Sequence, residues 1–177
     1  MMRRTGWVAL ALAVAAVLAP VTAASAAPAR SAPHCGITWG SQDKTAASAP
    51  TPPALTNIRA GRHGCYDRVV FDVRSGNVTG FQVRYVADMN WAASNEVVPL
   101  RGGAKLSILL MASDHTSYQC TNCTELVNVA GYSTFRQLSW AGSYRNATSV
   151  GLGVRARLPY RVFALPGRLV IDVAHRW

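Results

Sequence analysis

Hydrophobic and polar residues alternate in short runs along the chain after residue 54, and glycine, proline, asparagine and aspartate separate the runs. The runs are rich in valine, isoleucine, tyrosine and phenylalanine, and none has the three-to-four spacing of an amphipathic helix. In Cys120–Val129, Asn122 or Thr124 is positioned to cap a short helix. The pattern predicts an all-β sandwich or barrel with at most one short helix. Nine runs are expected to form strands: Leu55–Ala60, Arg68–Arg74, Gly80–Val86, Val97–Leu100, Lys105–Met111, Phe135–Ser139, Ser149–Arg157, Tyr160–Ala164 and Arg168–Ala174.

Two of these runs nearly repeat each other, about a hundred residues apart. Asp67–Val73 reads DRVVFDV, and Gly167–Val173 reads GRLVIDV. In each copy the period-two alternation of a strand places three apolar residues on one face and an arginine, a valine and an aspartate on the other. The charged residues of one copy are therefore positioned to pair with their counterparts on a neighbouring strand. We predict that both copies are core strands of one sandwich, which pair with each other or face each other across the core.

The first 26 residues have the three-part layout of a secretory signal peptide. Met1–Arg4 supply positive charge, Trp7–Val21 are almost wholly apolar, and small residues ending at Ala26 form an A-x-A cleavage pattern. The apolar run is shorter than a usual membrane span, and no later stretch is long and apolar enough to be one. We expect cleavage after Ala26, with an uncleaved anchor as the alternative. The secreted product then has an Ala/Pro/Ser-rich tether and loop over 27–54, a folded domain over 55–177, and no transmembrane segment.

The chain is strongly basic, with 18 lysines and arginines against 8 acidic residues and a net charge of +10. Removal of residues 1–26 takes away two arginines and leaves a charge of +8. Only Lys44 and Lys105 are lysines, so arginine supplies nearly all of the charge. A positive exported protein is attracted to anionic surfaces such as wall polymers or lipid head groups. The alternative is that the excess of arginine reflects the base composition of the genome. No basic run with interleaved aromatics is present, so nucleic acid is not expected as a partner.

The cysteines agree with export. An even number in an exported chain indicates disulfides, and four cysteines permit three pairings. We favour Cys35–Cys65, which pins the N-terminal loop and contributes roughly 3 kcal/mol, together with Cys120–Cys123. The C-T-N-C spacing of the second pair also fits a redox motif, half of a zinc site or free thiols. Neither a βαβ context nor a second ligand pair at short spacing accompanies it. We expect no metal site and no cofactor.

Several stretches resemble a known family. RVVFDV followed by FQVRYV, and PYRVFALPGRLVIDV near the C-terminus, resemble the markers of the AMIN domain, and more closely those of the AMIN-like domain of small secreted actinobacterial proteins. CGITWG, GRHGC and AGSY also resemble the actinobacterial subgroup, whereas Trp91–Leu138 matches weakly and CTNC lies outside the pattern. The resemblance implies a small β-sandwich of two sheets. It also implies a non-catalytic role, because AMIN domains bring cell-wall amidases and secretion-system proteins to the envelope by binding peptidoglycan.

No catalytic arrangement stands out, so an enzyme is not expected. Asp114 and His115 lie beside Ser113, but hydrolase triads are assembled from separated segments rather than from neighbours. Nothing selects a pair of carboxylates for glycoside cleavage. The histidines are scattered along the chain at His34, His63, His115 and His175.

Aromatic and arginine side chains are the best candidates for ligand contacts. A sugar ring stacks on an aromatic face, and arginine binds carboxylates or phosphates in a bidentate manner. Most aromatics are expected in the core, but polar, turn-rich surroundings favour exposure of Trp91 and Tyr144, with Arg84, Arg101 and Arg145 as their cationic neighbours. Two functions follow from these observations. The first is an envelope-binding module for peptidoglycan or an anionic wall polymer, and the second is an interaction domain that partners an exported enzyme.

Overall fold

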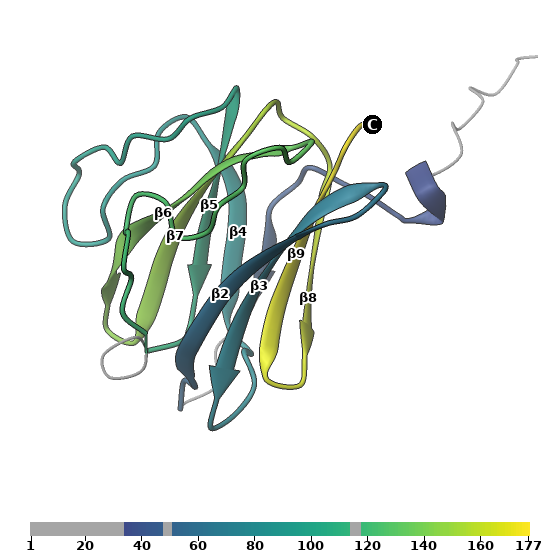
Figure 1. Ribbon diagram of the computed structural model, residues 1–177. Helices are drawn as coiled ribbons and strands as arrows, with labels where there is room; N and C mark the ends of the chain where they lie inside the picture. Colours follow the sequence, from purple (N-terminus) through teal and green to yellow (C-terminus); the bar gives the residue numbers. More distant parts are fainter. Residues whose placement is uncertain (1–33, 48–50, 114–117) are drawn as a thin grey trace, which may run out of the picture. The chain divides into compact units, whose positions relative to one another are not determined.

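Nine strands in two antiparallel sheets make up the described part of the chain (Figure 1), which the computed structural model gives as residues 34–47, 51–113 and 118–177. The expected signal peptide, the tether as far as residue 33, and His115 lie outside these residues. One 3-10 turn, His34–Gly36, precedes the strands. The all-β sandwich is therefore confirmed. The strands are β1 (Lys44–Ala46), β2 (Ala54–Arg62), β3 (Tyr66–Arg74), β4 (Phe81–Val86), β5 (Ala104–Leu110), β6 (Phe135–Tyr144), β7 (Ala147–Val154), β8 (Tyr160–Leu165) and β9 (Arg168–Ala174).

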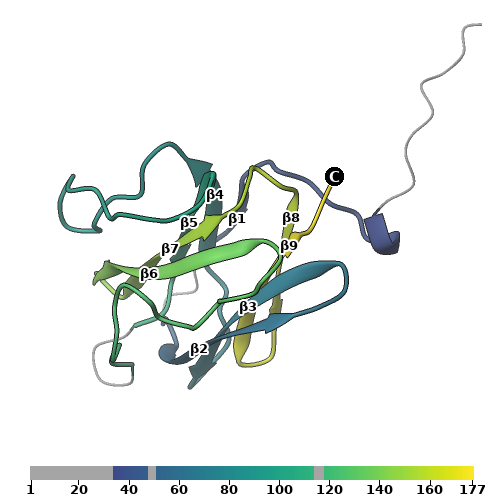
Figure 2. The same cartoon turned by 45° about the horizontal axis from the view of Figure 1, so that its top comes forward.

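The two sheets lie face to face (Figures 1 and 2). The five-stranded sheet has the order β1-β4-β5-β7-β6, and the four-stranded sheet has the order β2-β3-β9-β8. Alternating side chains from both sheets fill the space between them, as in other sandwiches. The largest fully buried side chains in this core include Phe71, Phe135, Leu106 and Ile171.

Three details of the strand prediction are corrected. Val97–Leu100 is not a strand, because Val97 makes only an isolated bridge to Asn90. Cys120–Val129 forms turns instead of a helix, and the Asn122 side-chain oxygen accepts hydrogen bonds from the backbone N–H groups of Thr124 and Glu125, both at 3.2 Å. The short edge strand β1 lies in the segment that was expected to be a loop.

The repeated segments pair directly with each other as β3 and β9. In the antiparallel register Val70 faces Val170, Arg68 faces Asp172, and Asp72 faces Arg168. A local two-fold axis therefore passes between the two valines and exchanges each residue of one copy with its equivalent in the other. The apolar faces of both copies point into the core, and their charged faces form the outer surface of the four-stranded sheet.

Buried polar groups connect the two sheets. The carboxylate of Asp67 is fully buried and accepts hydrogen bonds from the backbone N–H groups of Thr134 (2.6 Å) and Phe135 (3.1 Å). The hydroxyl of buried Tyr160 on β8 lies 2.8 Å from the carbonyl oxygen of Val83 on β4, and burial raises the pKa of this phenol. Because buried polar groups are costly unless they are hydrogen-bonded, these contacts select one arrangement of the sheets.

Both expected disulfides are present, Cys35–Cys65 and Cys120–Cys123. The first ties the 3-10 turn to the connection between β2 and β3, so this turn is held at one end of the four-stranded sheet. None of the described residues belongs to a helix with the length and hydropathy needed to cross a membrane.

Candidate functional site

The connection between β4 and β5, residues 87–103, folds back onto the outer face of the five-stranded sheet. It is able to do so because β7 presents glycine there. A β-carbon at Gly153 would lie 1.9 Å from the carbonyl oxygen of Arg101, and one at Gly151 would lie 2.6 Å from a methyl group of Leu100. Any side chain at these two positions would therefore lift the connection away from the sheet.

A second, smaller hydrophobic cluster fixes this connection in place. Met89, Val98 and Ala141 are buried together, and Leu100 packs against them. Backbone hydrogen bonds then set the position of Trp91: its N–H donates to the carbonyl of Glu96 at 3.0 Å, and the next N–H donates to the carbonyl of Ala141 at 2.8 Å. Trp91 is thus presented by a folded element, and 37% of its surface is exposed.

A groove of about 320 Å³ lies between this connection, the outer face of β6 and the turn that follows Cys120. We call it the tryptophan groove, because Trp91 and Trp140 both line it. Trp140 is partly buried against the main core, and the ring of Tyr118 stacks on it at 5.5 Å between ring centres. The remaining lining residues are Val98, Pro99, Arg101, Cys123, Thr124, Glu125, Gln137 and Ser139.

The polar side of the tryptophan groove is held by a hydrogen-bond network. The side-chain amide of Gln137 accepts from the Arg101 N–H at 2.7 Å and donates to the Thr124 carbonyl at 2.8 Å. The guanidinium of Arg101 forms an ion pair with Glu125 and donates to the Arg136 carbonyl at 3.0 Å. The hydrogen bond to Glu125 raises the pKa of Arg101 above its ordinary value, so this side chain stays positive. The groove therefore combines the aromatic lining residues Trp91 and Trp140 with fixed donors and acceptors.

The disulfide Cys120–Cys123 shapes one wall of the groove. The carbonyl of Cys123 accepts hydrogen bonds from the backbone N–H of Trp140 (2.7 Å) and from the hydroxyl of Ser139 (3.3 Å). The turn closed by the disulfide is thereby attached to β6. This pair of cysteines has a structural part in the groove, and the sulfur atoms are bonded to each other rather than free to act as ligands.

Comparison with known proteins agrees with this architecture. The sequence profile of the AMIN-like domain matches residues 53–175, which include β2 to β9 and the whole tryptophan groove. The chain belongs to the AMIN-like family. No curated protein and no solved structure matches it.

The five side chains expected to bind ligand do not form one site in this AMIN-like domain. Trp91 and Arg101 come together in the tryptophan groove. Arg84 is exposed on β4, and Tyr144 is 53% exposed at the turn between β6 and β7, where the guanidinium of Arg145 lies 5.1 Å from its ring centre. Sequence reasoning did not select Trp140, Gln137 and Glu125, whose place in the groove depends on the path of the β4–β5 connection.

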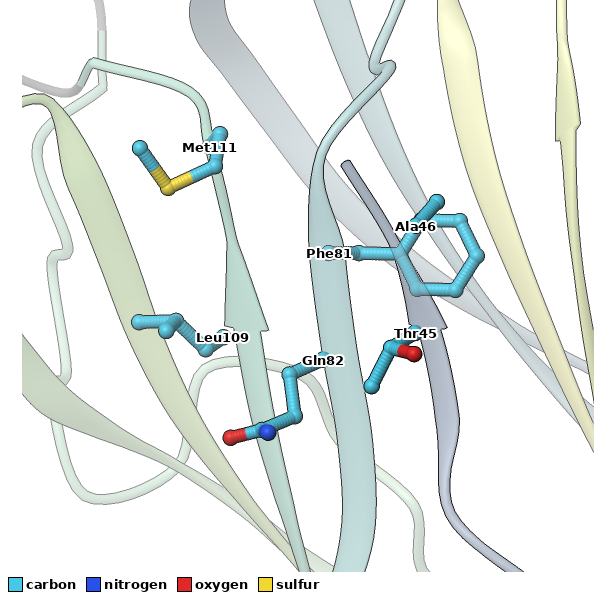
Figure 3. A pocket seen from close by; sticks show the side chains of 6 residues that line it. All are labelled: Thr45, Ala46, Phe81, Gln82, Leu109 and Met111. Atoms are coloured by element: carbon cyan, nitrogen blue, oxygen red, sulfur yellow. The ribbon is translucent and has the colours of Figure 1, made fainter. Parts of the chain in front are cut away.

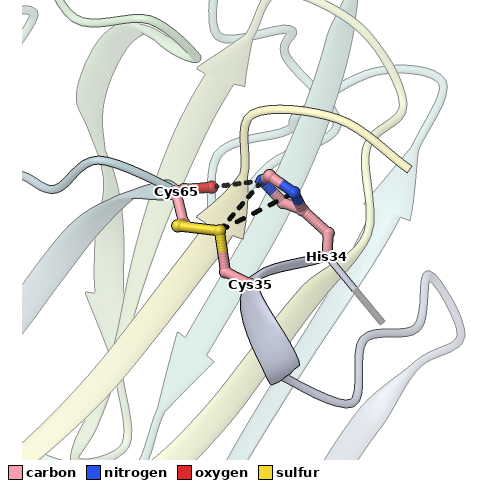
Figure 4. Close-up of side chains that lie close together, drawn as sticks. All are labelled: His34, Cys35 and Cys65. Carbon is pink, nitrogen blue, oxygen red and sulfur yellow. Dashed lines mark hydrogen bonds between the residues drawn. A yellow bond between two sulfur atoms is a disulfide. The ribbon is translucent and has the colours of Figure 1, made fainter. Parts of the chain in front are cut away.

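Two further features of the AMIN-like domain lie outside this groove. An apolar pocket of about 310 Å³ lies beside the edge strand β1 (Figure 3), lined by Thr45, Ala46, Phe81, Gln82, Leu109 and Met111. The ring of His34 lies against the Cys35–Cys65 disulfide and is 3.1 Å from the carbonyl oxygen of Cys65 (Figure 4). His34, Cys35 and Cys65 have metal-ligating atoms near one another. Because the two sulfur atoms form a disulfide, they are not the thiolates that zinc requires.

Proposed function

We propose that this chain is a non-catalytic module that binds the cell envelope, and that the tryptophan groove holds the glycan of peptidoglycan. The observation that supports this proposal is the presence of both Trp91 and Trp140 in the lining of one groove that also has fixed polar groups. Apolar faces of sugar rings stack on aromatic rings, while amides and guanidinium groups bind hydroxyls and carboxylates. Membership of the AMIN-like family supports a peptidoglycan-associated or interaction role. Two disulfides fit an extracellular protein.

Binding of the purified chain to cell-wall sacculi, with and without their teichoic acid, tests this proposal. We expect binding that persists at about 0.3 M salt, where the Debye length is only roughly 5–6 Å. Trp91→Ala should weaken it about ten-fold, because loss of aromatic burial costs on the order of 1–2 kcal/mol. The matched control is Tyr144→Ala, which removes an exposed aromatic outside the groove. Equal losses in both variants, or no binding to sacculi stripped of teichoic acid, would exclude the groove as a glycan site.

A second candidate function is docking of an exported protein beside β1. The apolar pocket there is one observation that favours it. The other is the shortness of β1, which pairs with Phe81, Gln82 and Val83 but not with the second half of β4. An incompletely paired edge accepts an added strand from a partner. Met111→Glu should abolish capture of such a partner and leave sacculus binding unchanged.

A further inference from the structure

The outer face of the four-stranded sheet carries a surplus of arginine in two rows across the strands. The first row contains Arg68 on β3, Asp172 on β9 and Arg161 on β8. The second row contains Asp72 on β3 and Arg168 on β9, with Arg59 reaching in from β2. Each row therefore has two arginines and one aspartate. The rows are related by the local two-fold axis between β3 and β9.

In the first row the carboxylate of Asp172 forms ion pairs with two arginines. Asp172 is fully buried, and Arg68 binds both of its oxygen atoms at 2.6 and 2.9 Å. Arg161 donates to the same carboxylate at 2.8 Å from each of two nitrogens. The two arginine side chains are 25% and 32% exposed, so parts of both reach the solvent. The row has a net charge of +1 and keeps guanidinium surface available to an anion.

The second row repeats this arrangement with different neighbours. Arg59 binds both oxygens of Asp72 at 2.7 and 3.0 Å, and the Asn57 amide donates to it at 3.3 Å. Arg168 faces Asp72 in the register and is exposed. The hydrogen bond from Arg59, with a smaller contribution from Arg168, holds the pKa of Asp72 below its ordinary value, so the carboxylate is charged at neutral pH. The net charge of this row is again +1.

Aromatic rings hold the arginines of the first row in position. The guanidinium carbon of Arg161 lies 5.4 Å from the ring centres of Trp39 and Tyr66 and 5.2 Å from that of Phe163. The guanidinium carbon of Arg68 lies 5.2 Å from the ring centre of Tyr66 and 5.6 Å from that of Phe163. Stacked guanidinium groups lose little conformational entropy when an anion binds, so the row is preorganised.

The spacing of the rows indicates the kind of anion that fits. Four residues of extended strand separate the rows, which corresponds to roughly 13 Å. A single small anion reaches one row, whereas a flexible chain with a charge on each repeat reaches both. Once such a chain is bound to one row, its contact with the second row is intramolecular, which raises the overall affinity. Phosphate groups are suited to guanidinium forks.

We propose that this face binds one linear polymer that has an ionised phosphate group in each repeat and lies across both rows. The proposal goes beyond the glycan groove, because the groove lies on the outer face of the other sheet. It places sugar recognition on one face of the domain and anion recognition on the opposite face.

Calorimetric titration of the purified chain with long-chain polyphosphate and with tripolyphosphate tests the proposal. Tripolyphosphate is too short to span the rows, so we expect the long chain to bind at least ten-fold more tightly per molecule. The double variant Arg59→Gln/Arg168→Gln disables the second row, and should reduce the affinity for the long chain to near that for tripolyphosphate. It should also make the salt dependence less steep by about one unit for each phosphate that the protein no longer neutralises. Arg84→Gln removes an exposed arginine from the other sheet and serves as the charge-matched control for the single variant Arg168→Gln.

Three results would overturn the proposal. Equal losses for the control and for one second-row variant, Arg168→Gln, would mean that binding follows total charge rather than the rows. Equal affinities for the long and short probes would mean that one row acts alone. Tighter binding to anionic lipid vesicles than to polyphosphate at the same salt concentration would assign the face to a membrane surface. Trp91→Ala should leave polyphosphate binding unchanged, so failure here is distinguishable from failure of the glycan site.

Discussion

Replacement of Asp172 by asparagine keeps the shape of the side chain but removes the negative charge shared by two arginines. The side chain is fully buried, whereas its partners Arg68 and Arg161 are partly exposed. Removal of one member of a buried ion pair costs about 3–5 kcal/mol. Both arginines reach water and recover part of their hydration, so we expect the free energy of unfolding to fall by about 2–3 kcal/mol. For a chain of this size that corresponds to a Tm lower by roughly 5–10 °C.

The second copy of the repeat supplies a matched control. Asp72 occupies the equivalent position in β3, but its side chain is 25% exposed and its partner Arg59 is 48% exposed. Screening by solvent reduces the value of such a pair, so Asp72→Asn should cost less than about 1 kcal/mol. Both substitutions have the same chemistry and the same strand position. The difference between them therefore reports the burial of Asp172 together with the second arginine that it binds.

Urea unfolding at pH 7, followed by tryptophan fluorescence, measures both variants. The midpoint should move much further for Asp172→Asn than for Asp72→Asn, with the same m-value as the wild type in each case. Equal shifts for the two variants would refute the argument, since they would show that burial of this carboxylate does not determine its contribution.

Three other perturbations test other parts of the structure. Gly153→Ala should displace the β4–β5 connection and abolish sacculus binding, because the new β-carbon would lie 1.9 Å from a backbone oxygen. In the control variant Gly64→Ala the new β-carbon meets nothing within 4 Å, so this variant should bind sacculi as the wild type does. Asp72 has a lowered pKa in the folded chain. Its contribution to stability is therefore complete above its unfolded pKa of about 3.9 and is lost as the pH falls through the lower folded value. The difference in free energy of unfolding between wild type and Asp72→Asn should shrink on acidification below about pH 4. Deletion of residues 168–177 should abolish the cooperative thermal transition, and a truncated chain that still melts cooperatively would contradict the central place of β9.

The strands were predictable from sequence where a strand has a clear alternation of residues. β3 and β9 each place three apolar residues on one face, and this pattern allowed their core position to be expected, with direct pairing as one of two expected arrangements. β1 was missed because Lys44–Ala46 has no apolar alternation and is held by hydrogen bonds to β4. Val97–Leu100 has the composition of a strand, but Val98 and Leu100 belong to a separate small cluster instead of a sheet.

The candidate site was predictable only in part, because it depends on contacts between distant segments. The polar surroundings of Trp91 correctly indicated exposure. Trp140 lies within an alternating strand and packs against the core, and it lines the groove only because the β4–β5 connection folds over β6. The glycines of β7 were the available signal, since Gly151 and Gly153 interrupt a strand at alternate positions on one face.

The position of β9 has a consequence for how the chain folds. The last strand to be synthesised is an interior strand of its sheet and lies between β3 and β8. Its pairing with β3 joins residues about a hundred positions apart, and such distant contacts carry a large loop-closure entropy and slow folding. Within this sheet the hairpin of β2 and β3 gains its neighbouring strand only when β9 has been made. The four-stranded sheet therefore lacks one of its two interior strands until β9 is made, so the complete sandwich cannot form earlier.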